Sequence, residues 1–215
     1  MVRRQLRSRG VPDSLDNHFC LTDELPERVT SNTLFENDHP LEIEIGSGKG
    51  LFMRSVSERQ PESNFLGIEV AYKYAQHAAT GLAKDGRGNA MMASGDAMPI
   101  MNQSVPDASL AAVHVYFPDP WWKKRHKKRR VLSDQMLNNI DRTLMPGGRF
   151  HFWTDVLEYF ENVVQRMAEI VPQLGPPIPE QPPVPTHDLD FRTHFERRSH
   201  KLEIPVYRVR FDKPA

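Results

Sequence analysis

The chain has 215 residues, of which 39% are hydrophobic and 26% are charged, a composition typical of one soluble globular domain rather than a fibrous or disordered protein. No run approaches about 18 consecutive apolar residues, and the arginine-rich N-terminus has no apolar stretch behind it, so a membrane span and a secretory signal are excluded. The 28 Lys and Arg balance the 28 Asp and Glu, and this zero net charge, taken alone, argues against a polyanionic partner. Cys20 is the only cysteine, which excludes an internal disulfide and fits a reducing, cytoplasmic location.

The first 40 residues are polar and rich in turn-forming residues, and we expect residues 1–40 to form an N-terminal arm that is partly flexible. From residue 41 the pattern changes. Residues 41–46 alternate apolar side chains with acids, which predicts a strand, and a run of alternate glycines leads from it into a predicted helix over 51–60. Further strands are predicted over 65–70, 89–94, 109–117 and 149–154. Helices are predicted over 71–86 and 156–171, and another is predicted to begin after Ser133, which is its N-cap.

Strands that alternate with helices at this spacing predict an α/β fold with a doubly wound, mostly parallel sheet, formed by residues 41–215 as one domain. Seven of the 18 prolines fall in residues 172–185, and we expect an extended loop there rather than a linker, because too little chain follows to form another domain. The tail over 192–211 is typical of a short helix and a closing strand. Sheets of this kind bind ligands beyond the carboxyl ends of their strands.

The sequence Glu-Ile-Gly-Ser-Gly-Lys-Gly follows the first of these strands, and such a turn brings bare backbone close to a ligand. It is not a P-loop, which needs a glycine where Ile43 stands and Ser or Thr where Gly50 stands. Its G-x-G-x-G spacing also differs from the G-x-G-x-x-G of dinucleotide sites. The acid before the turn, Glu44, suits a ligand that carries an amino group rather than a phosphate. The motif therefore points to S-adenosylmethionine, bound beside Gly46 and Gly48.

Two further acids follow strand ends, in the order that a nucleoside site requires. Glu69 lies 19 residues after Gly50, close to the spacing of about 20 at which nucleotide sites place an acid on the ribose hydroxyls. Asp96, with Ala97 after it, follows the third strand and is expected near the adenine. Each acid taken alone is equally consistent with a solvated strand end, but the combination favours a nucleoside site.

The fourth predicted strand runs into Pro-Asp-Pro-Trp-Trp and then into seven Lys or Arg within residues 123–130. This density is typical of polyanion binding, although a basic run is also common as a solvated surface. Asp119 stands between two prolines, and Trp121 and Trp122 offer stacking faces or core anchors, so the segment indicates modification of a base in RNA or DNA. The zero net charge is therefore a sum of opposed blocks: residues 1–9, 123–130 and 192–213 carry +4, +7 and +4, and the rest carries −15.

These motifs resemble, in the same order over residues 40–211, those of the bacterial single-chain tRNA (guanine-N7-)-methyltransferase family. The glycine turn is generic to this class of enzymes, whereas the Pro-Asp-Pro-Trp block with its basic run, together with Thr-x-x-Glu in the tail, is specific to the family. The resemblance implies the Rossmann-like fold of class I S-adenosylmethionine-dependent methyltransferases. It also implies transfer of a methyl group to N7 of a guanine in the variable loop of tRNA.

The resemblance further implies roles for individual residues. S-adenosylmethionine would be bound by Glu44, Gly46, Gly48, Glu69, Asp96, Ala97 and Asp119, and Asp119 would also be the catalytic acid. The substrate guanosine would be contacted by Lys123, Asp155, Thr193 and Glu196, and the RNA would be held by basic residues that include Arg125, Arg129 and Arg130. No metal is implied, tRNA is the expected partner, and both a monomer and a homodimer stay open.

Two positions depart from the family pattern: Trp122 stands where a polar residue is expected, and Ser47 replaces a bulkier residue in the turn. Thr193 and Glu196 also form the pattern of a capping box, and Asp155 is placed to cap the helix from residue 156. Capping and substrate contact are compatible, because a helix N-terminus is itself a polar ligand site.

Guanine N7 carries a lone pair and no proton, so the reaction needs no general base, and positioning N7 in line with the methyl group contributes most. A carboxylate beside the ring, assigned to Asp119, stabilises the positive charge that the ring gains. Glu196 or Asp155 is placed to accept from the N1–H and N2–H₂ edge that distinguishes guanine from adenine. The alternatives are a nicotinamide-dependent oxidoreductase, a non-catalytic nucleic-acid-binding module, and a methyltransferase acting on another RNA or on protein. The glycine spacing disfavours the first, and acids that face a polyanion disfavour the second.

Overall fold

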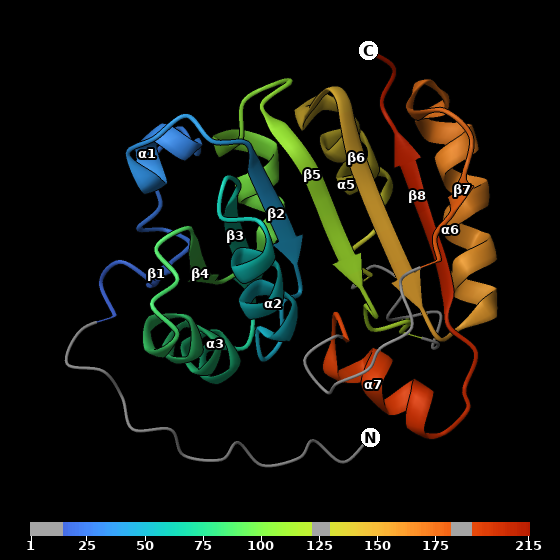
Figure 1. Ribbon diagram of the computed structural model, residues 1–215. Helices are drawn as coiled ribbons and strands as arrows, with labels where there is room; N and C mark the ends of the chain where they lie inside the picture. The colour runs from blue at the N-terminus through green and yellow to red at the C-terminus, as the bar shows by residue number, and fades with distance from the viewer. Residues whose placement is uncertain (1–14, 122–129, 182–190) are drawn as a thin grey trace.

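The structure, a computed structural model, describes residues 15–121, 130–181 and 191–215. The described residues form an eight-stranded sheet in the order β1-β4-β3-β2-β5-β6-β8-β7 (Figure 1). Strands β1 to β6 pair in parallel with their neighbours, whereas β8 is antiparallel to both β6 and β7. The predicted doubly wound, mostly parallel sheet is therefore confirmed.

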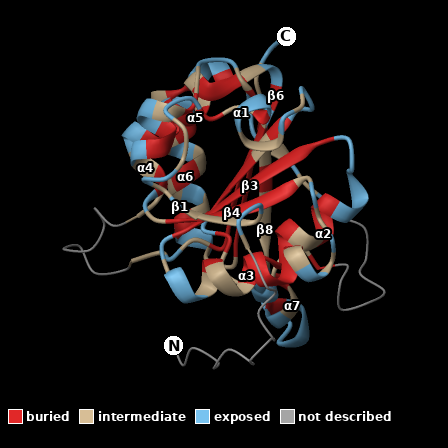
Figure 2. Cartoon of the chain, turned by 90° about the vertical axis from the view of Figure 1, so that its left-hand side faces the viewer, coloured by how far each residue is buried: buried red, intermediate tan, exposed pale blue. Residues whose placement is uncertain are grey.

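The middle of the sheet consists of the strands that the sequence predicts. They are β2 (Leu41–Ile45), β3 (Asn64–Glu69), β4 (Ala90–Ser94), β5 (Leu110–Tyr116) and β6 (Leu144–Thr154). Every residue of β3 and β4 is buried, because parallel strands in the middle of a sheet are covered on both faces. Figure 2 shows these strands as a buried layer between helices whose outer sides are exposed.

Three further strands complete the sheet: β1 (Phe19–Leu21), β7 (Ile178–Pro179) and the predicted closing strand β8 (Tyr207–Asp212). β1 pairs with β4, and Val29 is fully buried, so the expected N-terminal arm packs on the domain over its described part. β7 lies inside the expected proline-rich loop and pairs only with β8. A proline is tolerated there because an edge strand needs no donor on its outer side.

Helices cover both faces of the sheet. α2 (Leu51–Arg59) and α3 (Tyr72–Lys84) lie on one face, and α5 (Asp134–Thr143) and α6 (Leu157–Ile170) lie on the other (Figure 1). Each pair buries an apolar cluster against the strands. The first cluster includes Phe52, Met53, Leu82, Phe65, Met92 and Trp153, and the second includes Leu137, Ile140, Val163, Ile43, Val113 and Phe152.

The remaining helices are short. They are α1 (Ser31–Phe35), α4 (Ala97–Pro99), a π-helical turn (Ile100–Ser104), a 3₁₀ turn (Pro172–Leu174) and the predicted tail helix α7 (His194–Lys201). The predicted cap of α5 is confirmed, because the Ser133 hydroxyl accepts from the N–H of Met136 at 3.3 Å. α7 lies below the lower ends of β5 and β6 in Figure 1, where it closes one end of the sheet.

β6 begins at Leu144, whereas the sequence predicts a strand only from residue 149. The N–H of Gly147 donates to the carbonyl of Lys213 at 3.0 Å, and the N–H of Lys213 donates to the carbonyl of Gly148 at 2.9 Å. The C-terminal residues thus hold the glycine pair to the sheet. A Gly-Gly pair after a helix does not reveal such a distant contact, which is why the early start of β6 was not predicted.

Gly50, which joins the glycine turn to α2, is expected to be intolerant of a side chain. Its φ is +71°, and a Cβ at this position would lie 2.5 Å from Cβ of Ala78 in α3. We expect Gly50→Ala to lower the free energy of unfolding by about 2 kcal/mol or more, through left-handed backbone strain and overpacking. Urea unfolding measures this loss as a lower midpoint at an unchanged slope. Gly88→Ala is the control, since a Cβ there meets nothing within 4 Å; equal losses in both variants would contradict the prediction.

Candidate functional site

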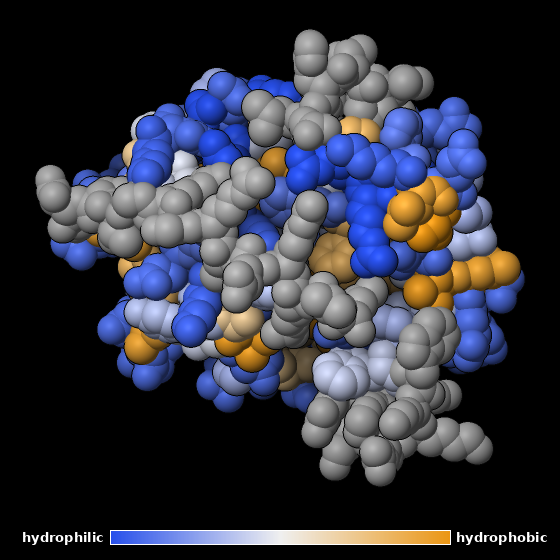
Figure 3. Space-filling view, turned by 90° about the horizontal axis from the view of Figure 1, so that it is seen from below, coloured by the Kyte–Doolittle hydropathy of each residue, from blue (hydrophilic) through white to orange (hydrophobic). Residues whose placement is uncertain are grey.

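The carboxyl ends of β2, β3, β4 and β5 meet at one end of the sheet, the lower end in Figure 1. β3 and β4 lie on one side of β2, and β5 and β6 lie on its other side, so the order of the strands reverses between β2 and β5. Open α/β sheets bind ligands at such a switch point. Figure 3 looks onto this end, and the part of its surface that is not grey is mostly hydrophilic, with a few hydrophobic side chains among the polar ones.

The glycine turn after β2 presents bare backbone to open space. Gly46 and Gly48 have φ of +84° and +54°, and a Cβ on either residue would meet no atom within 4 Å. The N–H groups of Gly46 and Ser47 both donate to the carbonyl of Ile68, at 2.8 and 3.2 Å, which fixes the turn against the end of β3. The two glycines therefore leave the backbone of the turn open on one side, and their role in ligand binding stays a prediction.

Glu69 at the end of β3 holds this turn. Its Oε2 accepts from the N–H of Gly48 at 2.9 Å, and its Oε1 accepts from the N–H of Ala71 at 2.8 Å. Glu69 is 9% exposed, so this carboxylate is a buried link between the ends of β2 and β3. A carboxylate offers about four lone-pair sites, so both oxygens can still accept from a ligand.

Glu44 has a carboxyl oxygen at this end of the sheet whose hydrogen bonding is incomplete. It is only 3% exposed, and its Oε2 is buried without a partner. Burial raises the pKa of Glu44 to about 8. The nearby charge of Glu69 also raises this pKa, whereas a hydrogen bond from Ser47 lowers it. An unpaired buried carboxyl costs free energy, so a ligand that brings a donor or a positive charge to Oε2 would be stabilised there.

Asp96 and Asp119 follow the ends of β4 and β5, and both are exposed. Oδ1 of Asp96 accepts from the N–H of Met98 at 2.9 Å and caps α4, in which Ala97 is buried. Before Asp119 the chain turns sharply at Phe117, whose φ is +50°. The structure thus brings Glu44, Glu69, Asp96 and Asp119 to the same end of the sheet, as the sequence predicts.

Asp155 stands between β6 and α6 and is half-buried. The alternative that it caps α6 is wrong: the N-cap is Val156, which has no side-chain cap bond, and the N–H of Val156 donates to the hydroxyl of Thr154 at 3.2 Å. The Asp155 carboxylate is therefore not used to begin the helix.

Thr193 and Glu196 do begin a helix, as the alternative to substrate contact predicts. The Thr193 hydroxyl accepts from the N–H of Glu196 at 3.0 Å. The Glu196 carboxylate, 4% exposed, accepts from the N–H of Arg192 at 2.7 Å and from the guanidinium of Arg208 at 3.2 Å, rather than from the N–H of Thr193 as in a full capping box. Glu196 thus ties α7 to β8.

A buried chain of polar contacts, not predicted from the sequence, joins the residue before Thr193 to the middle of the sheet. Arg192 donates to the hydroxyl of Tyr116 at 2.7 Å, and its guanidinium lies 4.7 Å from the ring centre of Trp153. The same hydroxyl is 2.9 Å from Nδ1 of His114, whose Nε2 is 2.7 Å from Oε2 of Glu42. Burial lowers the pKa of His114 to about 4, so the imidazole is neutral near pH 7. A neutral ring that accepts from Tyr116 and donates to Glu42 satisfies every member of the chain.

A second set of polar contacts joins the proline-rich segment to His114. His151 stacks on His114, with ring centroids 4.8 Å apart, and its Nδ1 lies 2.9 Å from Oε1 of Glu180. Nε1 of Trp153 donates to Oε2 of Glu180 at 2.6 Å. Although burial opposes them, the contacts with His151 and Trp153 lower the pKa of Glu180 to about 2. The only sign of these contacts in the sequence is the presence of His114 and His151 in two mostly apolar strands.

Arg130 is bonded within the protein. Its Nε donates to the carbonyl of Pro120 at 2.8 Å, and its guanidinium lies 4.8 Å from the ring centre of Tyr159 in α6. These contacts fasten the end of the basic segment to α6, a role that the prediction of RNA contact does not include. The other predicted basic contacts, Lys123, Arg125 and Arg129, lie outside the described residues, as does Trp122.

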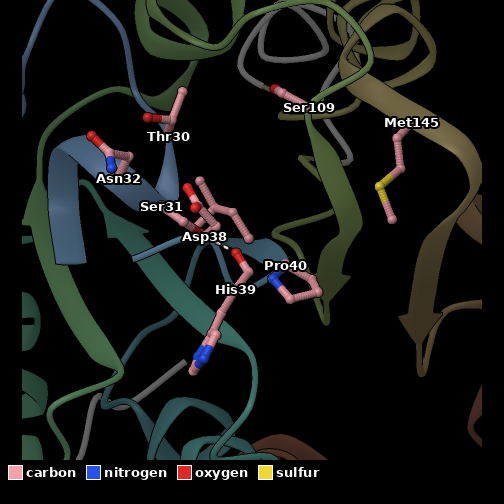
Figure 4. Close-up of a pocket in the computed structure, with 9 residues that line it drawn as sticks. Thr30, Ser31, Asn32, Asp38, His39, Pro40, Ser109 and Met145 are labelled. Carbon is pink, nitrogen blue, oxygen red and sulfur yellow. Dashed lines mark hydrogen bonds between the residues drawn. The ribbon is translucent and has the colours of Figure 1, made fainter. Parts of the chain in front are cut away.

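A hollow of about 320 Å³ lies at the opposite end of the sheet, near the amino ends of β2 and β5 (Figure 4). It is lined by Thr30, Ser31, Asn32, Asp38, His39, Pro40, Leu41, Ser109 and Met145. None of the predicted site residues lines it, so it is separate from the candidate site. Within the described ranges, no helix has the length and apolar character to span a membrane, and no group of three or more His, Cys, Asp or Glu side chains is placed to hold a metal ion.

The sequence matches a family of methyltransferases. A family model described as "Putative methyltransferase" matches residues 38–209. A tRNA (guanine-N(7)-)-methyltransferase of Rhodopirellula baltica is 56% identical over 99% of this chain and 80% of its own length. An enzyme of the same name from Cronobacter sakazakii is 32% identical over 99% of this chain and 90% of its own length.

Solved structures with low sequence identity share the fold. The 16S rRNA methyltransferase KamB superposes with a TM-score of 0.60 at 16% identity, over 87% of this chain and 96% of that chain. An S-adenosylmethionine-dependent O-methyltransferase of Thermotoga maritima gives a TM-score of 0.53 at 15% identity, over 85% and 62% of the two chains. The Rossmann-like fold of class I methyltransferases, expected from the sequence, is therefore confirmed.

The raised pKa of Glu44 predicts how stability changes with pH. The folded protein holds this proton up to about pH 8, whereas an ordinary glutamate releases it near pH 4.5. The stabilisation is therefore complete below pH 4.5 and is lost as the pH rises to about 8. Relative to Glu44→Gln, whose amide does not titrate, we expect the free energy of unfolding of the unaltered protein to fall across this window by at most about 1.4 kcal/mol per pH unit. Urea unfolding of both proteins at several pH values measures the difference, and parallel profiles would contradict it.

Proposed function

The chain belongs to the tRNA (guanine-N(7)-)-methyltransferase family, and we propose that it transfers a methyl group from S-adenosylmethionine to N7 of a guanine in tRNA. The observation that carries the proposal is the unpartnered, buried Oε2 of Glu44 beside the exposed backbone of the glycine turn. It is a buried carboxyl oxygen at the switch point of a methyltransferase fold, and a ligand with a donor or a positive charge would stabilise its ionised form. The tRNA is the proposed partner, and the cytoplasm is the proposed location.

S-adenosylmethionine, when bound, supplies a methyl group on a positively charged sulfonium. Glu44 would accept from its amino group, which gives Oε2 the donor that it lacks. The bare backbone at Gly46 and Gly48 would lie against the same end of the ligand. Glu69 would accept from the ribose hydroxyls while it continues to hold the turn through Gly48 and Ala71. The donor set fits the ligand, because acceptors meet its amino and hydroxyl groups.

Asp96 and Ala97 would border the adenine. Asp96 has one oxygen committed to the N–H of Met98, and the carboxylate is exposed, so the second oxygen is available to a ligand. Its position after β4 follows those of Glu44 and Glu69 after β2 and β3. The three acids would therefore follow the ligand from its amino acid end to its base.

Asp119 would lie beside the reacting guanine. N7 needs no base to be nucleophilic, so the contribution of this chain is to orient the ring and to stabilise the positive charge that the ring gains. Thr193 retains its hydroxyl hydrogen for the substrate, because in the cap bond the hydroxyl only accepts. Glu196 accepts from Arg192 and Arg208 and has lone pairs left for the N–H edge of guanine, and the uncommitted Asp155 would supply a further acceptor.

The basic segment would hold the tRNA backbone. Residues 123–130 hold seven Lys or Arg, among them Lys123, Arg125 and Arg129. Arg130 would mainly fasten the segment to α6 through Pro120 and Tyr159. Binding that depends on several phosphate contacts weakens steeply with salt, which is expected here.

The proposed reaction is tested with bulk tRNA that lacks 7-methylguanosine. The protein and S-adenosylmethionine are incubated with this tRNA, and the site of methylation is mapped by chemical cleavage at 7-methylguanosine. We expect cleavage at one guanine of the accepting tRNAs. Methyl transfer to ribosomal RNA or to protein instead of tRNA would overturn the assigned substrate. Failure to bind S-adenosylhomocysteine in calorimetry would overturn the assigned ligand.

Asp119→Ala tests the residue assigned to the chemical step. We expect the single-turnover rate to fall by about 100-fold or more, because a preorganised charge beside the reacting group is removed. The affinity for S-adenosylhomocysteine is expected to fall less. Glu62→Ala is the matched control, since Glu62 is also an exposed acid but precedes β3 at the other end of the sheet. An unchanged single-turnover rate in Asp119→Ala would remove the residue from this role.

A further inference from the structure

Phe195 is an aromatic side chain that stays 44% exposed at the start of α7. It stands between Thr193 and Glu196 on the first turn of α7. Its ring stacks on that of Phe117, with centroids 6.0 Å apart and planes 18° apart. Phe117 is 8% exposed and belongs to the apolar cluster that includes Trp153. One side of Phe195 therefore rests on the core, and a large part of the ring is open to solvent.

Both supports of this ring are fixed. Phe117 directly follows β5, and its N–H donates to the carbonyl of Trp153 at 2.7 Å. The start of α7 is held by the Thr193 cap and by Arg192, which donates to the Tyr116 hydroxyl at 2.7 Å. The position of Phe195 is thus defined relative to the residues that lead into Asp119, which lies two residues beyond Phe117.

The surroundings favour a nucleic acid base as the occupant of this face. Arg198 follows Phe195 by three residues, on the same side of α7, and is exposed. An apolar protein surface would have to cover this cation, whereas a polynucleotide offers a phosphate to it and a flat ring to Phe195. Proteins that recognise unpaired bases combine cations with exposed aromatic rings in this way.

We propose that Phe195 is a base-stacking residue that holds the target guanine, once it has left the stack of the tRNA, with its N7 edge at Asp119. This inference rests on the proposed function and adds to it the group that binds the face of the base, whereas Thr193, Glu196 and Asp155 would bind its edge. An enzyme that acts on a base in folded RNA must hold that base outside its stack, and an aromatic face does so for little loss of conformational freedom.

Two substitutions separate stacking from packing. Phe195→Leu keeps an apolar side chain on Phe117 but has no ring, and Phe195→Tyr keeps the ring. We expect Phe195→Leu to lower kcat/KM for tRNA by about 10- to 100-fold, with unchanged affinity for S-adenosylhomocysteine, and Phe195→Tyr to stay within about threefold of the unaltered protein. Leu202→Ala, which removes another exposed apolar side chain (56% exposed) at the end of the same helix, is the matched control and should change little.

Two further measurements make the outcome decisive. A fluorescent guanine analogue at the target position should be quenched on binding to the unaltered protein and bright with Phe195→Leu. If Phe195→Leu unfolds, Phe195→Met, with an unbranched apolar chain, replaces it in the test. Equal losses with Leu and Tyr, equal activity of Leu and the unaltered protein, or a loss confined to S-adenosylhomocysteine binding would each overturn the inference. Absence of tRNA methylation by the unaltered protein would instead overturn the proposed function.

Discussion

The parallel pairing of β2 with β3 and β5 is the constraint on which the candidate site depends. Parallel strands have all their carboxyl ends at one end of the sheet, so the residues that follow each strand are collected there whatever their distance along the chain. Acids gathered in this way repel one another and lose hydration. Hydrogen bonds from two backbone N–H groups stabilise the carboxylate of Glu69, whereas Oε2 of Glu44 has no hydrogen-bond partner. The buried, unpartnered oxygen of Glu44 therefore favours a ligand that brings a donor or a positive charge to this end of the sheet.

The tail of the chain is joined to this site by polar contacts inside the protein rather than by apolar packing alone. Arg192 reaches the hydroxyl of Tyr116, and from there the contacts continue through His114 to Glu42 in β2. Burying polar groups such as His114 and Tyr116 is costly unless each is satisfied, and here each of the four groups has a partner of matching donor or acceptor character. Such a chain has one geometry that satisfies all its members. It therefore sets where α7 begins, and with it the positions of Thr193, Phe195 and Glu196.

The net charge of this protein says little about its partners, whereas the distribution of the charges along the chain is informative. Three basic blocks are offset by a remainder of −15, and within the described residues the acids at the strand ends lie in the same region as the cations of α7. Arg130 illustrates a second use of a basic residue, because its guanidinium is bonded to Pro120 and stacked on Tyr159. A basic run can thus contain one residue that fixes the segment to the fold, while its neighbours remain the candidates for phosphate contact.

The sequence by itself determined the order of strands and helices, the glycine turn, the acids that follow the strands and the cap at Thr193. All of these are predicted by patterns a few residues long, namely the alternation of apolar side chains, the spacing of glycines and the cap residues. Only the tertiary structure decided that β1 and β7 extend the sheet, that Glu69 holds the glycine turn, and that Arg192 meets Tyr116, 76 residues away. It also decided that Phe195 lies on Phe117 with much of its ring exposed. These contacts depend on which distant strands and helices become neighbours, and no local pattern of residues encodes that choice, because the same short pattern is compatible with many partners.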